Sequence, residues 1–310
     1  MKTRLVIFIL GLLLLPVAGL WLSGAGWGDL VLRGLTGDAA IINPPSTLLT
    51  TLMMAGYIIF INHLNQLISG NRPFQGQSSY LLRVAAASAV LGWLLAYLNL
   101  YVASWTTQIG NPLLQALLYT PLFAALAPAV LCTRAFIAAL PGVLQRLHSH
   151  RTFAPPAPEK LAYALLLLAA LGLAGGAGWP AQLHPLLWLA PLLLLTALQL
   201  LWHENTIFSG LKSGDYGRMI CSGVAGLITG NFVLFAYQSN GGLLVIQDTQ
   251  FKPLGLLLFG LLCIQLADML AEEWRGKKRG GIFPTKKPLI PVVVKNNGYN
   301  HLPGEHGGGL

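Results

Sequence analysis

Two groups of polar side chains stand at the ends of apolar segments, and their residue types could support chemistry. The first polar cluster is Asn62 and His63, and the second is His203, Glu204, Asn205, Asp215 and Arg218. A carboxylate beside an imidazole can accept and donate protons, so Glu204 with His203 could handle a proton or bind a ligand. Because neighbouring residues of a helix point about 100° apart, both cannot closely face one substrate. The structural alternative is a helix-end cap made by Asn205 and Thr206.

The histidines of the two clusters also define a cofactor hypothesis. His63 and His203 stand at comparable positions in their segments, and two neutral imidazoles on separate helices can clamp a b-type haem. The alternative is a pair of interfacial histidines with polar contacts, which a single histidine per helix favours. The other histidines and the three cysteines do not form a metal-ligand pattern. We therefore predict no metal site and no cofactor other than this haem alternative.

Further polar residues are predicted to lie inside membrane spans, where such groups are costly and often functional. They are Asn99, Asn231, Gln238 and Asp268. The uncharged three could line a solute path or hydrogen-bond to a neighbouring helix. Small residues also recur at helical spacing, at Gly223, Gly226 and Gly230. This stripe predicts a close-packing face for another helix or another subunit.

The composition indicates which solvent surrounds these residues. The chain of 310 residues is 55% hydrophobic and only 9% charged, with a mean hydropathy of +0.63. A soluble domain carries roughly 25% charged residues, so this chain could not cover a water-facing surface. Although the net charge is +9, the basic residues flank apolar segments instead of forming a soluble face. We therefore expect the lipid bilayer, and not nucleic acid, as the partner.

Eight apolar segments are long enough to be predicted as transmembrane helices. They cover residues 5–22, 48–67, 84–102, 113–140, 161–177, 186–202, 219–237 and 254–270. This pattern predicts an all-α, polytopic integral membrane protein. The first segment follows Lys2 and Arg4 and also resembles a secretory signal peptide; we expect it to be retained as a helix.

The basic residues alternate between the predicted loops. They precede the first span, lie between spans two and three, four and five, and six and seven, and follow the eighth, whereas the other loops hold only Arg33 and Lys252. Because basic loops stay on the cytoplasmic side, we predict a bacterial inner-membrane protein with both termini in the cytoplasm. The basic run 275–287 is expected to contact anionic lipid headgroups. The tail 275–310 could dock on a protein partner.

Similar features recur about 140 residues apart and suggest an internal duplication. Each polar cluster is followed by a Gly-Asn or Gly-Asp turn and an arginine, at Arg72 and Arg218. We predict two halves of four helices each, 1–147 and 161–274, joined by a Pro-rich cytoplasmic linker at 148–160 and followed by the basic tail. Halves with an even number of spans share one orientation, so the repeats would be parallel. The alternative is chance similarity between two ordinary helix ends.

Glu204-Asn205-Thr206, followed by Gly214-Asp215 and Arg218, resembles a family of uncharacterised bacterial inner-membrane proteins. In that family a Glu-Asn-Thr cluster precedes a Gly-Asp-Trp-Arg turn and a Gly- and aromatic-rich span. Here Tyr216 and Gly217 stand where the family has the tryptophan. The resemblance covers only 202–240, within the second half, and implies a multi-pass membrane protein without implying an activity.

Three functions remain open at this point. The scarcity of charge within the spans and the small-residue faces favour a non-catalytic subunit, scaffold or assembly factor of a membrane complex. The apparent repeat and the two prolines in the fourth span favour a transporter of a small solute or lipid. Glu204, Asp215 and Arg218 could serve an interfacial enzyme acting on a lipid or isoprenoid, but no paired acidic motif for magnesium and diphosphate is present.

Overall fold

The fold is a bundle of long helices, seen here in a computed structural model. It describes residues 44–70, 77–107, 112–148, 150–153, 157–246 and 249–274, together with Gly11, Leu14 and Pro16. The long helices are α3 (Pro44–Ser69), α4 (Ser78–Val102), α5 (Pro112–Ala139), α7 (Pro158–Gly178), α8 (Pro180–Leu201), α9 (Gly217–Ser239) and α10 (Lys252–Trp274). The shorter elements are α6 (Val143–Leu147), the 3₁₀ helix η1 (Ser209–Ser213) and the strands β1 (Trp105–Thr107) and β2 (Leu244–Ile246).

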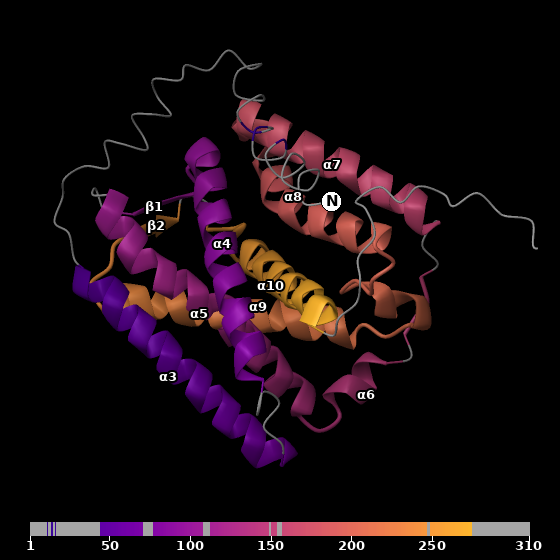
Figure 1. Ribbon diagram of the computed structural model, residues 1–310, viewed down its shortest axis with the longest axis horizontal. Coiled ribbons are helices and arrows are strands. Elements are labelled where there is room, and N and C mark those ends of the chain that lie inside the picture. Colours follow the sequence, from indigo (N-terminus) through magenta and orange to yellow (C-terminus); the bar gives the residue numbers. More distant parts are fainter. Residues whose placement is uncertain are drawn as a thin grey trace, which may run out of the picture.

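Seven of the described helices are long and apolar enough to cross a membrane. They match the second to eighth predicted spans in order, so the all-α, multi-pass prediction is confirmed for this part of the chain. Apart from Gly11, Leu14 and Pro16, the predicted first span lies outside the described residues, as does the basic tail. In Figure 1, α3 lies along one flank and α7 with α8 along the opposite flank, with α4, α5, α9 and α10 between them.

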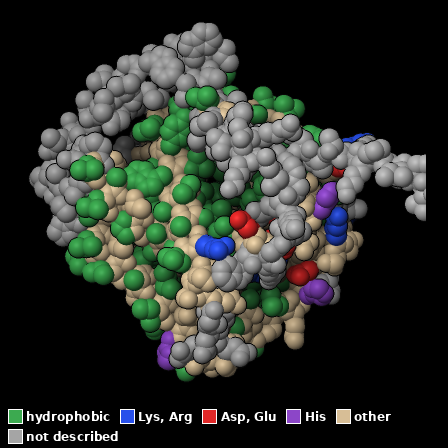
Figure 2. All heavy atoms as spheres, in the orientation of Figure 1, with side chains coloured by type: hydrophobic (Ala, Val, Ile, Leu, Met, Phe, Trp, Pro, Cys, Tyr) green, Lys and Arg blue, Asp and Glu red, His purple; other side chains and the backbone are tan. Residues whose placement is uncertain are grey.

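The two ends of the bundle are built differently. At one end, which we call the ribbon end, β1 follows α4 and β2 follows α9, and the strands pair antiparallel, with Trp105 opposite Ile246. At the other, which we call the loop end, residues 202–216 connect α8 to α9 and include η1. In Figure 2 the charged side chains gather mostly toward α6 and the end of α10, while hydrophobic side chains cover the flank of α3 and α5.

Glycines allow two helix pairs to approach closely. A Cβ on Gly172 of α7 would stand 2.6 Å from the Leu186 carbonyl oxygen of α8. A Cβ on Gly226 of α9 would stand 2.5 Å from the Cα of Gly260 on α10. Gly223 and Gly230 also face α10, where their added Cβ atoms would contact Leu257 and Leu256. The small-residue stripe of α9 therefore packs against a helix of the same chain.

A serine connects α4 to α5 between the two prolines of α5. The Ser88 hydroxyl donates to the Phe123 carbonyl at 2.5 Å and accepts from the Ala127 amide at 2.9 Å. In an ordinary α-helix the Ala127 amide would donate to the Phe123 carbonyl. Here the Ser88 hydroxyl contacts both groups and bridges them. Pro121 and Pro128 lie on either side of this position. Insertion of a side chain beside proline is a recognised cause of a bend in a helix.

Candidate functional site

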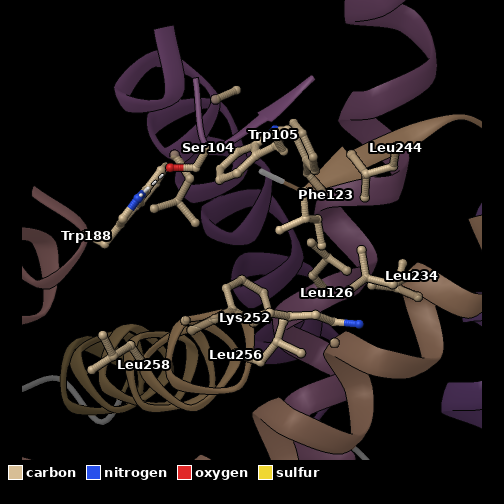
Figure 3. Close-up of a pocket in the computed structure, with 18 of the residues that line it drawn as sticks. Ser104, Trp105, Phe123, Leu126, Trp188, Leu234, Leu244, Lys252, Leu256 and Leu258 are labelled. Atoms are coloured by element: carbon tan, nitrogen blue, oxygen red, sulfur yellow. Dashed lines mark hydrogen bonds between the residues drawn. The ribbon is translucent and has the colours of Figure 1, made fainter. Parts of the chain in front are cut away.

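A cavity of about 390 Å³ lies in the ribbon-end half of the bundle. Its walls come from α4, α5, α8, α9, α10 and both strands. Figure 3 shows the labelled leucines of α5, α9 and α10 facing this space, with Trp105 and Trp188 on its other side. Pockets for small ligands have volumes of roughly 300–1,000 Å³ and mostly apolar walls. The cavity fits that description.

Aromatic rings form the ribbon-end wall of the cavity. Trp105 of β1 stacks on Trp188 of α8, with ring centroids 4.9 Å apart. The Trp188 indole donates to the Ser104 hydroxyl at 3.1 Å, which holds the β1 turn against α8. Asn99 of α4 stabilises the same turn, because its amide donates to the Trp105 carbonyl at 2.7 Å and its oxygen accepts the Trp105 amide. Asn99 therefore positions a cavity wall and does not itself line the cavity.

Most polar groups of the cavity wall already have protein partners. Ser88 is held by α5, and Ser104 accepts from Trp188. The hydroxyls of Tyr119 and Tyr237 lie 3.2 Å from one another across the α5–α9 contact. A ligand would therefore meet an apolar surface over most of this wall.

The exceptions lie at the ribbon-end starts of three helices. Lys252 of α10 and Gln115 of α5 line the cavity and have no hydrogen bond or ion pair with any described residue. His184 of α8 lines it too and contacts the edge of Phe251, with centroids 5.7 Å apart. Figure 3 shows the Lys252 side chain extended within the cavity wall. One ammonium group beside a largely apolar space suits a ligand with an acidic head and an apolar chain.

Buried residues close the bundle between the cavity and the loop end. Val84, Val130, Leu262 and Ile264 belong to one hydrophobic cluster, and each is less than 5% exposed. Leu262 also lines the cavity, so this cluster begins at its floor. The helix bundle is therefore hollow toward the ribbon end and packed toward the loop end.

The structure does not join the predicted polar clusters into one site. Glu204 is 5% exposed, whereas the neighbouring His203 and Asn205 are exposed. Asp215 accepts the Gly217 amide at 2.8 Å at the start of α9, and its second oxygen lies 3.9 Å from His148. Asp215 therefore serves the chain turn at the start of α9.

The first polar cluster lies on a different flank. His63 is exposed near the end of α3, and Figure 1 places α3 and α8 on opposite sides of the bundle. Axial haem ligands must face the same iron from two sides, which His63 and His203 do not do in this arrangement. Asn62 is partly buried near the same helix end, and its side-chain oxygen has no hydrogen-bond partner among the described residues.

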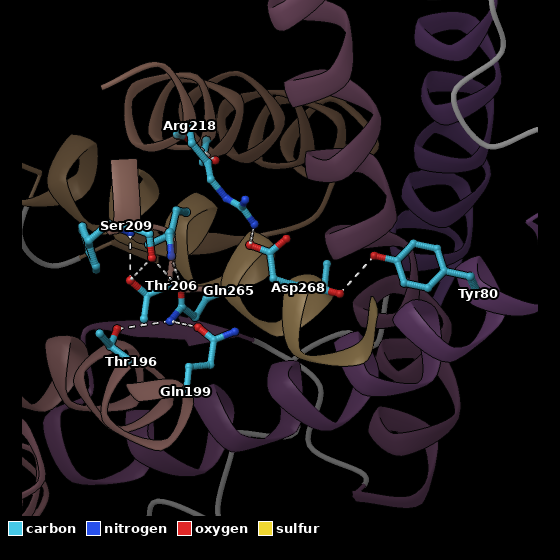
Figure 4. Close-up of polar contacts among 12 residues, drawn as sticks. Tyr80, Thr196, Gln199, Thr206, Ser209, Arg218, Gln265 and Asp268 are labelled. Carbon is cyan, nitrogen blue, oxygen red and sulfur yellow. Dashed lines mark hydrogen bonds and ion pairs between the residues drawn. The ribbon is translucent and has the colours of Figure 1, made fainter. Parts of the chain in front are cut away.

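Arg218 has a partner from another helix. Its guanidinium forms an ion pair with Asp268 of α10, and Figure 4 shows the two side chains meeting between α9 and α10. Asn231 and Gln238 are exposed on α9, and the Asn231 amide donates to Leu227 one turn earlier. Asp268 is thus the predicted intramembrane polar residue that connects two helices through its side chain.

Two buried glutamines were missed by the reasoning from sequence. Gln199 of α8 and Gln265 of α10 are both 0% exposed. The Gln265 amide donates to the Gln199 oxygen and, at 3.3 Å, to the Thr196 hydroxyl, while its own oxygen accepts the Ile207 amide at 2.9 Å (Figure 4). This network ties the loop 202–216 to both helices. A glutamine within an apolar segment was the available signal.

No protein family, curated protein or solved structure matches the chain. The resemblance of 202–240 to the inner-membrane family therefore stays a prediction. Among the described residues, no group of three or more His, Cys, Asp or Glu side chains is placed to hold a metal ion.

Proposed function

We propose that this chain is a membrane transporter for an anionic amphiphile, a lipid or isoprenoid with an acidic headgroup. The observation that carries the proposal is the cavity, where Lys252 is a cation without an ionic partner among the described residues in an otherwise largely apolar wall. The amphiphile's chain would occupy the space between α5, α9 and α10. Its headgroup would meet Lys252, with His184 and Gln115 as further hydrogen-bonding groups.

The charge of Lys252 favours an anionic over a neutral ligand. Lys252 begins α10 and is partly buried, and a cation that is partly removed from water is stabilised by an anionic partner. Hydrogen bonds between charged groups are shorter and stronger than those between neutral groups. A headgroup carrying a carboxylate or phosphate would therefore gain more at Lys252 than an alcohol would.

The arrangement of the two halves supports transport. β1 and β2 follow α4 and α9, which are equivalent spans of the predicted repeat, and the two strands pair with each other. In addition, α5 contacts α9, and α10 contacts α4. We therefore propose a parallel tandem repeat around the cavity, an architecture common among transporters, whose binding sites lie at the repeat interface.

We infer that the loop end faces the cytoplasm of a bacterial cell. Seven of the eight described lysines and arginines stand toward that end, at residues 83, 134, 146, 151, 160, 212 and 218, and only Lys252 stands at the ribbon end. Positively charged segments stay on the cytoplasmic side. The cavity would then be hollow toward the outer half of the membrane.

The two other functions gain no comparable support. The subunit or scaffold hypothesis stays a prediction, with the tail outside the described residues. An interfacial enzyme using Glu204, Asp215 and Arg218 would need those groups to converge, whereas Asp215 caps α9 and Arg218 pairs with Asp268.

The proposal is tested by Lys252→Gln in proteoliposomes that contain the full chain. Wild-type protein should move a fluorescent anionic lipid analogue between leaflets faster than protein-free vesicles do. Loss of one charge-assisted hydrogen bond costs about 1.5–3 kcal/mol, so Lys252→Gln should weaken binding of the analogue by at least about tenfold. Lys160→Gln, at an exposed lysine of the loop end, is the matched control and should behave as wild type.

A second pair of variants tests whether filling the cavity slows transport. Ala96→Phe places a ring into the cavity wall, whereas Ala86→Phe changes an exposed position of the same helix. We expect only Ala96→Phe to slow movement of the analogue. If Lys252→Gln and Ala96→Phe both transport as wild type does, the proposal is wrong.

A further inference from the structure

A second group of charges lies at the loop end, apart from the cavity. Arg134 of α5, Arg218 of α9 and Asp268 of α10 come from three different helices. Arg218 is ion-paired with Asp268, and Arg134 is within electrostatic range of both. Leu126 at the cavity is eight residues before Arg134 on α5, which is about 12 Å along a helix. The two features are therefore separate.

The positive charge of this group is not balanced by its own acid. Among the residues that the structure describes, Asp268 is the single carboxylate that acts on both guanidinium groups, and it is ion-paired with Arg218 alone. Glu272 acts on Asp268, but it is not among the groups that act on Arg134. Within the described residues Arg134 has no hydrogen bond or ion pair, and its Nε is enclosed. The Nε of Arg218 is enclosed without a hydrogen-bond acceptor as well.

A guanidinium inside a membrane span needs a compensating partner. Its planar fork of N–H donors matches the oxygens of a phosphate better than it matches any neutral group. The Arg218 side chain is 34% exposed, so the group borders the loop-end surface and can be reached from there. We propose that Arg134 and Arg218 together bind a phosphate oxyanion at the loop end, carried by a lipid headgroup or present as free phosphate.

This site goes beyond the proposed transport function and does not depend on it. An arginine that only stabilises the fold would be expected to have an acceptor within the chain. An arginine kept for a ligand leaves its donors free until the ligand binds. Neutralising such an arginine should not lower the stability of the ligand-free protein, and this difference can be measured.

The test uses the purified full chain in detergent and compares Arg134→Gln with wild type. Arg146→Gln, at an exposed arginine of α6 at the same end, is the matched control. The probes are phosphatidylglycerol, phosphatidylcholine and inorganic phosphate. Thermal unfolding midpoints are measured with each probe, and lipid binding is measured by native mass spectrometry. A ligand that binds the folded state raises the midpoint.

We expect phosphatidylglycerol or inorganic phosphate to raise the midpoint of wild type and of Arg146→Gln. Arg134→Gln should lose that increase and bind the same probe at least about tenfold more weakly. Its midpoint without any probe should equal or exceed that of wild type. Arg134→Lys keeps the charge without the fork and should bind with intermediate strength.

The separate probes identify the source of the phosphate. A response to inorganic phosphate indicates a free anion, and a response to phosphatidylglycerol alone indicates a lipid headgroup. The proposal is overturned if neither probe raises the wild-type midpoint, or if Arg134→Gln binds within twofold of wild type. A lower midpoint of Arg134→Gln without probe would also overturn it, because Arg134 would then be structural. Because the proposed transport site also binds anionic lipids, wild type and Arg134→Gln are also compared in the Lys252→Gln background, and the same loss is expected there.

Discussion

At the scale of single residues, the basic side chains within the bundle differ in their partners. Arg218 is ion-paired with Asp268, whereas Lys252 and Arg134 have no ionic partner among the described residues. Both side chains are partly buried, and burying a charge without a partner is costly. An anionic ligand at each end of the bundle would supply the missing partner.

Reasoning from the sequence located some of these residues and missed others. Arg218 was identified as part of the second polar cluster, and Asp268 because an ionisable group in an apolar segment stands out. Their ion pair was not predicted, because it joins two helices through residues distant in the chain. Lys252 was treated only as a loop charge, because the sequence does not reveal that a cavity lies beside it. Gln199 and Gln265 carry no charge and therefore gave a weaker signal.

At the scale of elements, the helices were predictable because lipid imposes a length and a composition on each one. The seven confirmed spans follow directly from that constraint. The β1–β2 ribbon was not predictable, because two strands of three residues have no pattern of their own and are stabilised by pairing across the bundle. That ribbon forms part of the cavity wall, so the site could not be assembled from the sequence.

Close packing of α9 on α10 gives a prediction for Gly226. A methyl group there would meet the Leu256 carbonyl and the Gly260 backbone, and neither can move without shifting a helix. We expect Gly226→Ala to destabilise the bundle by about 1–3 kcal/mol, the usual cost of overpacking. Unfolding by denaturant in mixed micelles measures this change.

Gly56 of α3 provides the control for this prediction. It also lies within a long helix, but a Cβ added there would meet nothing within 4 Å. Because alanine favours helix over glycine, Gly56→Ala should be neutral or stabilising. Equal effects of the two substitutions would show that the α9–α10 contact is looser than described.

At the scale of the whole molecule, the two ends of the bundle are expected to face different compartments. All three cysteines are buried, so new surface cysteines can be labelled selectively. We expect an impermeant thiol reagent added to intact cells to label Gln182→Cys, at the exposed ribbon-end start of α8. Ser213→Cys, exposed in η1 at the loop end, should be labelled only after lysis. The reverse pattern would refute the proposed orientation.

The central claim is that the cavity holds the chain of an anionic amphiphile. The most direct measurement is photocrosslinking with an anionic lipid that carries a diazirine on its chain, followed by mapping of the adducts by mass spectrometry. We predict adducts at cavity residues such as Leu126 and Leu258, and their loss in Lys252→Gln. Adducts confined to outward-facing residues of α3, such as Leu52 and Ile59, would contradict the claim.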